Sequence, residues 1–295
     1  MTDAGTTDTA TTDTVAAGDH ACLTFTDPEE RLDLVAAFVR DGLRAGCKVV
    51  CWTDTARPDT LAGQLAARSV RPRAALRRGQ LRLASVTGSL LGAGQVRAAD
   101  MVSVLAREVE AAGREGYRGL RVTADMAWAS RPLAAADQLQ RFETEVAALF
   151  GDGRLCLICQ YDRDRFDAVT LAFAAKTHPK TIAAQVYLEH PLLRVCRQYS
   201  PPGIRIAGEL DFAHRDILEQ ALTESLRLDG HPHLNLAALD YLDGACAAVI
   251  VAAATRLAAS RRITVVCRRR VATVLDLVGA NATPRLRVHL AHDQP

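Results

Sequence analysis

From His20 onward, short apolar runs alternate with longer amphipathic segments, and this alternation limits the fold more than any other feature of the sequence. After the first run, 20–25, a helix start is expected: Asp27 can cap the helix and Pro28 suits its first turn. Further runs with strand character lie at 48–53, 81–86, 119–126 and 154–161. Runs that are apolar throughout are typical of parallel strands covered on both faces. The sequence therefore predicts a doubly wound, three-layer α/β sheet with right-handed crossovers.

A second pattern begins near Leu192 and predicts a smaller α/β domain. Two runs, 192–198 and 203–210, are expected to pair as strands. Three helices and three further strands then alternate to the end of the chain. At roughly 100–200 residues per domain, a length of 295 residues also suits two domains. We expect a disordered Thr/Asp/Ala tail over 1–17, a first domain over 18–190 and a second over 192–295.

Composition and charge argue against several classes of partner. The formal net charge is only +2 and aromatic residues make up 5% of the chain, so a nucleic-acid partner is not expected. No apolar run reaches the ~18 residues of a membrane span, and the first residues do not resemble a signal peptide. A cytoplasmic location is therefore expected, with no membrane partner.

The eight cysteines are expected to be buried free thiols, because most lie inside apolar runs. Cys156 and Cys159 form a C-x-x-C pair within a strand-like run. Residues three apart in a strand point to opposite faces, so this pair is not expected to chelate one ion. We predict no metal site and no cofactor.

The turn after the first strand lacks the features of a phosphate site. It contains Asp27, Glu29 and Glu30 but no glycine or lysine, and the chain has no P-loop motif. We therefore predict that the first domain does not hydrolyse ATP. Asp125 ends an apolar strand, where an ATPase would hold magnesium. Without a P-loop, a helix cap or an ion pair with one of the neighbouring arginines is the favoured role for Asp125.

Several polar and aromatic residues lie at strand ends and predict a small-molecule pocket. A crevice commonly forms at the carboxyl edge of a parallel sheet. The candidate lining residues are His20, Asp125, Trp128 and Tyr161.

Ordered motifs over about 18–190 resemble the MEDS sensory domain, first described in methylotroph and methanogen regulators. The motifs are GDHAC (18–22), DPEE (27–30), GLRAGCKVVCWTD (42–54), RRGQL (77–81), GYRGLRVTADMAWA (116–129), Phe142-Glu143, CQYDR (159–163) and His178-Pro179. The resemblance implies a sensor with a RecA-like layout but no P-loop.

Residues 192–295 resemble a STAS domain, the fold of anti-sigma factor antagonists, through IAGELD (206–211) and HLNLAALDYLD (233–243). The resemblance implies a partner-binding surface around Asp211, Tyr241, Asp243 and Gly244. It also implies that an anti-sigma factor or a sensor kinase is the partner. Gly244 stands where the family has its phosphoaccepting serine, so no phosphorylation is expected there. Thr255 or Ser260 remains an alternative acceptor.

Together these features predict a non-enzymatic signalling protein that regulates transcription, in which a sensor domain controls a partner-binding module. The alternative is a nucleotide-binding or thiol-dependent enzyme in the first domain. A positioned Cys–His pair would favour the thiol-dependent enzyme. A homodimer is left open.

Overall fold

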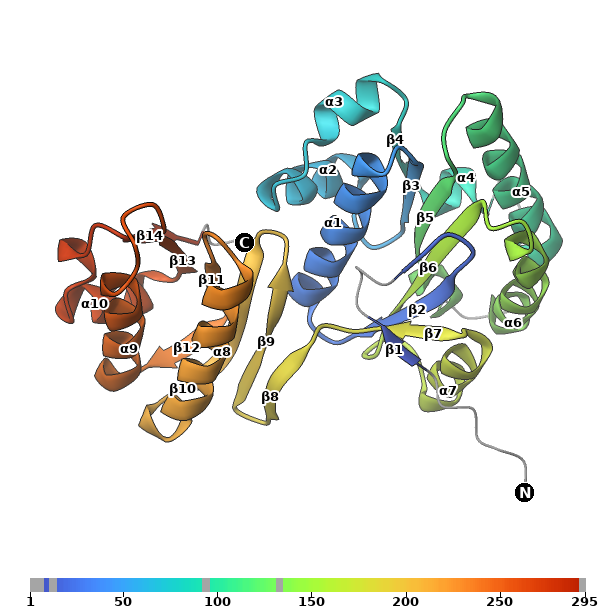
Figure 1. The fold of residues 1–295 in the computed structure, drawn as a ribbon. Helices are drawn as coiled ribbons and strands as arrows, with labels where there is room; N and C mark the ends of the chain where they lie inside the picture. Colours follow the sequence, from blue (N-terminus) through green and yellow to red (C-terminus); the bar gives the residue numbers. More distant parts are fainter. Residues whose placement is uncertain (1–7, 11–14, 92–95, 131–134, 292–295) are drawn as a thin grey trace. The chain divides into compact units, whose positions relative to one another are not determined.

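The computed structural model describes residues 8–10, 15–91, 96–130 and 135–291. The chain divides into two compact units, Met1–Ala183 and Ala184–Pro295 (Figure 1). None of the helices in the described ranges is long and apolar enough to cross a membrane.

The first unit is built on one sheet with the strand order β1-β7-β2-β6-β5-β3-β4, in which all paired strands are parallel. Its strands are β1 (Asp8–Ala10), β2 (His20–Phe25), β3 (Lys48–Thr53), β4 (Leu81–Ser85), β5 (Leu120–Asp125), β6 (Leu155–Asp162) and β7 (Lys180–Ile182). Its helices are α1 (Pro28–Arg44), α2 (Pro58–Ala67), α3 (Pro72–Arg77), α4 (Val86–Ser89), α5 (Ala98–Arg114), α6 (Ala135–Glu145) and α7 (Ala168–Thr177). The predicted parallel α/β layer is confirmed.

Helices cover both faces of this sheet. Figure 1 shows α1 and α2 on one face and α5 and α6 on the other. The start of α1 follows the expected chemistry: the Asp27 carboxylate accepts a hydrogen bond from the Glu29 N–H at 2.8 Å, and Pro28 opens the first turn. Strands β3 and β6 are buried along almost their whole length, because helices cover them from both sides.

The ends of the first unit differ from the sequence prediction. Part of the predicted tail, 1–7 and 11–14, lies outside the described residues, but β1 pairs with β7 and Val15 is buried. A disordered tail over all of 1–17 is therefore wrong. Strand β7 is the last strand of the first sheet along the chain. The boundary between the units lies at Ala183/Ala184 in the chain rather than near residue 191. Strand β7 pairs in the first sheet, whereas the next strand pairs in the second sheet.

The second unit contains a mixed sheet with the order β14-β13-β11-β10-β9-β8, and β12 also pairs with β10. Its strands are β8 (Val186–His190), β9 (Leu193–Tyr199), β10 (Pro202–Leu210), β11 (His233–Leu236), β12 (Leu239–Leu242), β13 (Ile263–Cys267) and β14 (Leu286–Leu290). Its helices are α8 (Arg215–Leu228), α9 (Gly244–Thr255) and α10 (Arg269–Leu277). The predicted pairing of β9 with β10 is confirmed and is antiparallel.

Strand β10 changes partner along its length. Its first half pairs with β11 and its second half with β12, with a register shift between Gly208 and Glu209. Gly208 has φ +99°, and a Cβ there would lie 2.1 Å from the Leu192 carbonyl oxygen. Only glycine fits this close approach. The segment 233–242, where the alternating pattern predicts one strand, therefore forms two strands, each paired with a different part of β10.

Candidate functional site

Strand β6 separates two groups of buried polar side chains in the first unit. Successive residues of a strand point to opposite faces, so Gln160 and Tyr161 project to opposite sides of the sheet. Tyr161 lies on the side of the core built on α5 and α6, whereas Gln160 contacts Arg31 of α1. Each side carries its own polar group.

On the α6 side, four buried residues form what we call the Glu143 cluster: His20, Glu143, Cys159 and His178. They come from the start of β2, from α6, from β6 and from the residue that caps the end of α7. The Oε2 atom of Glu143 lies 3.1 Å from His20 Nε2 and 3.3 Å from His178 Nε2. The Cys159 Sγ atom lies 3.6 Å from His20 Nε2.

Neighbouring groups hold these side chains in place. The Tyr161 hydroxyl donates a short hydrogen bond to Glu143 Oε1, the other oxygen of that carboxylate. His178 Nδ1 lies 2.7 Å from the Ala174 carbonyl oxygen, so Nδ1 carries a proton and Nε2 faces Glu143. The His20 ring stacks on Phe150 with the ring centroids 4.9 Å apart.

The charges of the cluster balance one another. Burial by itself would raise the pKa of Glu143, but the two histidines hold it well below its usual range. Burial lowers the pKa of His20. Burial would lower the pKa of His178 as well, but the Glu143 carboxylate outweighs it and raises that pKa. These shifts favour an ionised Glu143, a protonated His178 and a neutral His20.

Cys159 and His20 form the kind of pair that a thiol enzyme would need, but solvent does not reach it. Cys159 is fully buried and His20 is 5% exposed. Burial and the Glu143 carboxylate raise the pKa of the Cys159 thiol well above its ordinary value. Reactive cysteines have the opposite properties, a lowered pKa and access to solvent.

On the α1 side, Asp125 is the centre of a second buried group. Its carboxylate accepts hydrogen bonds from the Thr55 hydroxyl at 2.6 Å and the Thr55 N–H at 3.0 Å, and it pairs with Arg31 at 3.3 Å. It also accepts from the Ala127 N–H at 3.1 Å. Burial opposes ionisation, but Arg31 and the hydrogen bonds lower the pKa of Asp125. Asp125 thus makes a cap and an arginine ion pair, but the arginine is Arg31 of α1 rather than a neighbour in the sequence.

The structure does not bring the four predicted ligand residues into one pocket. His20 and Tyr161 meet at Glu143, but Asp125 is in register with Gln160 and projects to the opposite face of the sheet. Trp128 is 1% exposed within the same core as Tyr161, and its Nε1 atom has no hydrogen-bond partner among the described residues. The shared pocket is therefore wrong, because neighbouring positions of parallel strands alternate between faces.

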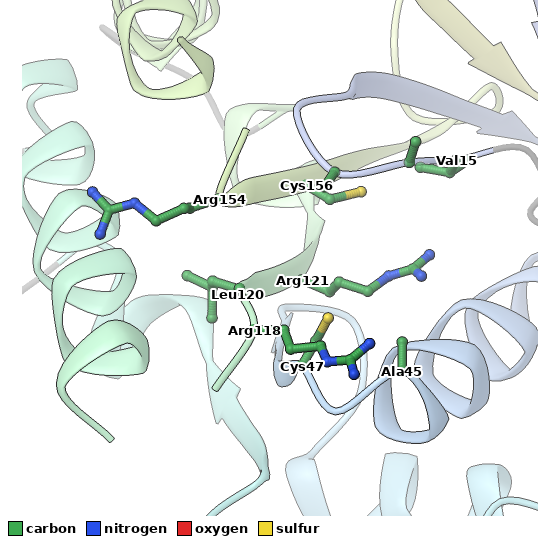
Figure 2. Close-up of a pocket in the computed structure, with 11 residues that line it drawn as sticks. Val15, Ala45, Cys47, Arg118, Leu120, Arg121, Arg154 and Cys156 are labelled. Atoms are coloured by element: carbon green, nitrogen blue, oxygen red, sulfur yellow. The ribbon is translucent and has the colours of Figure 1, made fainter. Parts of the chain in front are cut away.

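A pocket of about 280 Å³ lies instead at the amino edge of the sheet, where β3, β5 and β6 begin (Figure 2). Its lining residues are Val15, Ala16, Ala17, Ala45, Cys47, Arg118, Gly119, Leu120, Arg121, Arg154 and Cys156. Figure 2 shows the Arg118 and Arg121 side chains extending to one side and Arg154 to the other. The Nε and Nη2 atoms of Arg121 have no hydrogen-bond partner among the described residues, and the guanidinium stacks on Phe38, 4.0 Å from the ring centroid.

In the second unit, three of the four predicted partner residues lie at one sheet edge. Asp211 and Asp243 follow β10 and β12, and the Asp243 N–H donates to the Leu210 carbonyl oxygen at 3.1 Å. The Asp243 carboxylate caps α9 by accepting from the Cys246 N–H at 2.7 Å, and Gly244 opens the helix. Tyr241, the fourth residue, belongs to β12 itself and is 52% exposed.

Sequence reasoning missed the role of Glu143 and the partner of Asp125. In the sequence, Glu143 stands out only within a family motif, and no local pattern links Arg31 to Asp125. One signal was available: a glutamate in the middle of an otherwise apolar helix face, next to Phe142, points toward the core and needs a charged partner there. The prediction that Cys156 and Cys159 point to opposite faces is confirmed, since Cys156 lines the amino-edge pocket.

The chain is 28% identical over 170 residues to the "Transcriptional repressor DcmR" of Methylorubrum extorquens (strain DSM 6343 / CIP 106787 / DM4). That alignment covers 57% of this chain and 60% of the length of the relative.

Two solved structures align with part of this chain. The KaiC-like protein PH0186 of Pyrococcus horikoshii has a TM-score of 0.46 and 13% identity over 62% of this chain and 80% of its own. The flagellar accessory protein FlaH of Methanocaldococcus jannaschii has a TM-score of 0.42 and 10% identity over 64% of this chain and 83% of its own. Residues 19–179, more than half of the chain, match the family model described as "MEthanogen/methylotroph, DcmR Sensory domain", so this chain belongs to the MEDS family.

Proposed function

We propose that this chain is a non-enzymatic signalling protein that takes part in regulating transcription. Its first unit senses a chemical signal, and its second unit binds a partner protein. Membership of the MEDS family over 19–179 carries the proposal, because the family description is that of a sensory domain. Similarity to a protein named as a transcriptional repressor supports the same role.

The second unit supplies the output as a STAS-like module, and its partner is an anti-sigma factor or a sensor kinase. Support comes from the helix α9, which Asp243 caps at the edge where β10 and β12 end. Phe212 and Tyr241 are 74% and 52% exposed. Exposed aromatic residues of this kind are common in protein interfaces. Asp211, Tyr241, Asp243 and Gly244 form the proposed docking surface.

This module works without the phosphorylation switch of its family. Gly244 has no hydroxyl group, and a Cβ atom there would meet nothing within 4 Å. A serine side chain therefore fits at the start of α9. A phosphate on it would place about two negative charges beside Asp243.

The test uses purified protein, candidate anti-sigma factor kinases and ATP. We expect the unaltered chain to bind its partner kinase without being phosphorylated within 240–262. The variant Gly244→Ser should accept phosphate and lose the partner, whereas Gly244→Ala should bind normally and remain unmodified. Stoichiometric phosphorylation of the unaltered chain at Thr255 or Ser260, with loss of binding, would contradict the proposal.

The binding surface can be checked separately. Tyr241→Lys leaves the α9 cap intact and should weaken partner binding by at least tenfold, because it replaces an aromatic contact with an unmatched charge. Asp276→Lys introduces a lysine on the exposed side of α10 and is the control. Equal loss of binding in both variants would place the surface elsewhere.

The first unit is proposed not to be an ATPase. Its α1 N-terminus is already occupied by carboxylates: Asp27 caps the helix and Glu29 pairs with Arg68. A phosphate would meet repulsion there. We expect no steady-state phosphate release above background, and release that Asp125→Asn abolishes would refute this.

We place the sensed ligand in the amino-edge pocket of Figure 2, rather than at the carboxyl edge. The pocket is mainly apolar, and the two Arg121 nitrogens without hydrogen-bond partners can receive an anionic group. Small carboxylic acids such as benzoate are suitable probes in a thermal-shift assay. A stabilising acid should lose its effect in Arg121→Met; an unchanged effect would place the ligand elsewhere.

A further inference from the structure

The Glu143 cluster brings four metal-ligating atoms close together in a buried place. His20 Nε2, Glu143 Oε2, Cys159 Sγ and His178 Nε2 all lie within 4.8 Å of one another. The separations given above are 3.1, 3.3 and 3.6 Å, and Cys159 Sγ lies 3.8 Å from Glu143 Oε2. In a tetrahedral zinc site with bonds of about 2.0–2.3 Å, neighbouring ligand atoms are about 3.3–3.6 Å apart. The cluster is therefore close to the required size.

The surrounding hydrogen bonds orient the donor atoms inward. His178 Nδ1 is engaged by the Ala174 carbonyl oxygen, so Nε2 is the free nitrogen once the ring is neutral. That Nε2 atom is buried and makes no hydrogen bond within the described residues. Tyr161 occupies Glu143 Oε1 and leaves Oε2 facing the histidines. A ligand histidine bound to a backbone carbonyl and a ligand carboxylate held by a second hydrogen bond are usual around protein metal ions.

We propose that His20, Glu143, Cys159 and His178 bind one divalent transition-metal ion of the Zn²⁺ type. The donor set of two imidazoles, one thiolate and one carboxylate suits zinc, whereas magnesium and calcium prefer oxygen ligands. A thiolate and a carboxylate together neutralise a charge of +2, so the filled site carries no net charge. Binding displaces two protons to solvent, one from the Cys159 thiol and one from the His178 imidazolium.

The cluster is also an ion network, but in that role two of its donor atoms have only weak partners. An ionised Glu143 needs one charged histidine, and His178 supplies it. The network uses the Cys159 thiol only as a long donor to Glu143 Oε2, at 3.8 Å, and it leaves His178 Nε2 without a well-directed hydrogen bond. A bound cation uses both groups.

The site is closed and therefore has a structural role rather than a catalytic one. Four protein ligands and exposures of 0–5% leave no position for substrate or water. The ion would join β2, β6, α6 and the end of α7. It would hold α6 and α7 on the sheet of the sensory unit, whatever partner the second unit binds.

The test begins with the full chain, treated with a chelator and then titrated with Zn²⁺. We expect one bound equivalent by elemental analysis and a higher midpoint of thermal unfolding. Co²⁺ in place of Zn²⁺ should give the absorption of a tetrahedral ion with a thiolate-to-metal charge-transfer band. Absence of zinc retention together with an unchanged midpoint would overturn the proposal.

Matched variants decide whether these residues hold the ion. Cys159→Ser should remove the charge-transfer band and weaken zinc binding by at least 100-fold, whereas Cys156→Ser, on the opposite face of the same strand, should change neither. His178→Gln should also lower affinity at least 100-fold. Tyr161→Phe, a positioning variant, should lower it 10- to 100-fold while keeping the band. Zinc binding that is unchanged in both Cys159→Ser and His178→Gln would refute the assignment even if one variant were poorly folded.

Discussion

In the first unit, buried charged residues are the positions where a substitution is expected to lower stability most. Asp125 is 2% exposed and Arg31 is 9% exposed, and each satisfies the other across the carboxyl end of β5. Gln160 ties them to the sheet, because its side chain accepts from Arg31 Nε at 2.5 Å and donates to the Thr123 hydroxyl at 2.5 Å. Such a pair contributes little net stability compared with apolar residues, but removal of one partner is costly, because the other charge stays buried.

The first prediction concerns this pair. Asp125→Ala should lower the free energy of unfolding of the first unit by about 3–5 kcal/mol, since Arg31 is left without its counter-charge. Urea unfolding followed by circular dichroism measures the loss. Asp164→Ala, in an exposed turn after β6, is the control and should stay within about 0.5 kcal/mol of the unaltered protein.

The second prediction is the pH dependence of the same carboxylate. The folded-state pKa of Asp125 lies below its ordinary value, so the unfolded chain binds more protons in acid. The stabilisation is fully present above the unfolded-state pKa of about 3.9 and is lost as the pH falls through the folded value. The free energy of unfolding should therefore fall below about pH 4, with a shallower slope in Asp125→Asn. Equal slopes in the two proteins would contradict this.

At the level of elements, close packing of α1 on the sheet depends on one small residue. A Cβ atom on Gly42 would lie 2.7 Å from Arg121 Cδ and 2.9 Å from Val49 Cγ2. Gly63 of α2 is also within a helix, but a Cβ there would meet nothing within 4 Å. Both glycines therefore lie within helices, but only Gly42 has neighbours that leave no room for a Cβ atom.

The third prediction uses this contrast. Gly42→Ala should destabilise the first unit by about 1–3 kcal/mol, because the added methyl group must move β3 or Arg121. Gly63→Ala should stabilise it by about 0.5–1 kcal/mol, since alanine is the better helix former. Denaturant midpoints with unchanged slopes measure both effects. Stabilisation by both substitutions would show that the Arg121 side chain can move aside without loss of free energy of unfolding.

On the scale of the whole molecule, each unit has its own apolar core. One core gathers residues of β3, β5 and β6 with α5 and α6, including Leu105 and Phe142. The other gathers β10, β11 and β13 with α8 and α9, including Leu222 and Leu234. A core of this kind is what allows a domain to unfold as a unit.

The fourth prediction is that the two cores unfold separately. Leu222→Ala should lower only the unfolding transition of the second unit, and Leu105→Ala only that of the first, each by about 2–5 kcal/mol. Differential scanning calorimetry of the full chain, compared with residues 184–295 alone, resolves the assignment. A shift of both transitions by either variant would show that the units unfold together.

Most strands and helices, and their order along the chain, could be predicted from local sequence. Apolar runs such as 20–25 and 154–161 marked strands, and Asp27-Pro28 marked a helix start, because these signals depend on neighbours within a few residues. Parallel pairing could be predicted because polar and apolar residues do not alternate within these runs. The short strands β1, β7, β8 and β12 were missed, because three to five residues carry too little pattern and their pairing depends on distant strands.

Which side chains meet depends on how the strands and helices pack together. His20, Glu143, Cys159 and His178 are separated by up to 158 residues and become neighbours because β2 pairs with β6 while α6 and α7 cover the same face. The same strand geometry sent Asp125 to the opposite face, away from Tyr161, although both end neighbouring strands. A local pattern gives the period of a strand, but the face that each residue occupies relative to a distant one is fixed only when strand register and helix packing are set.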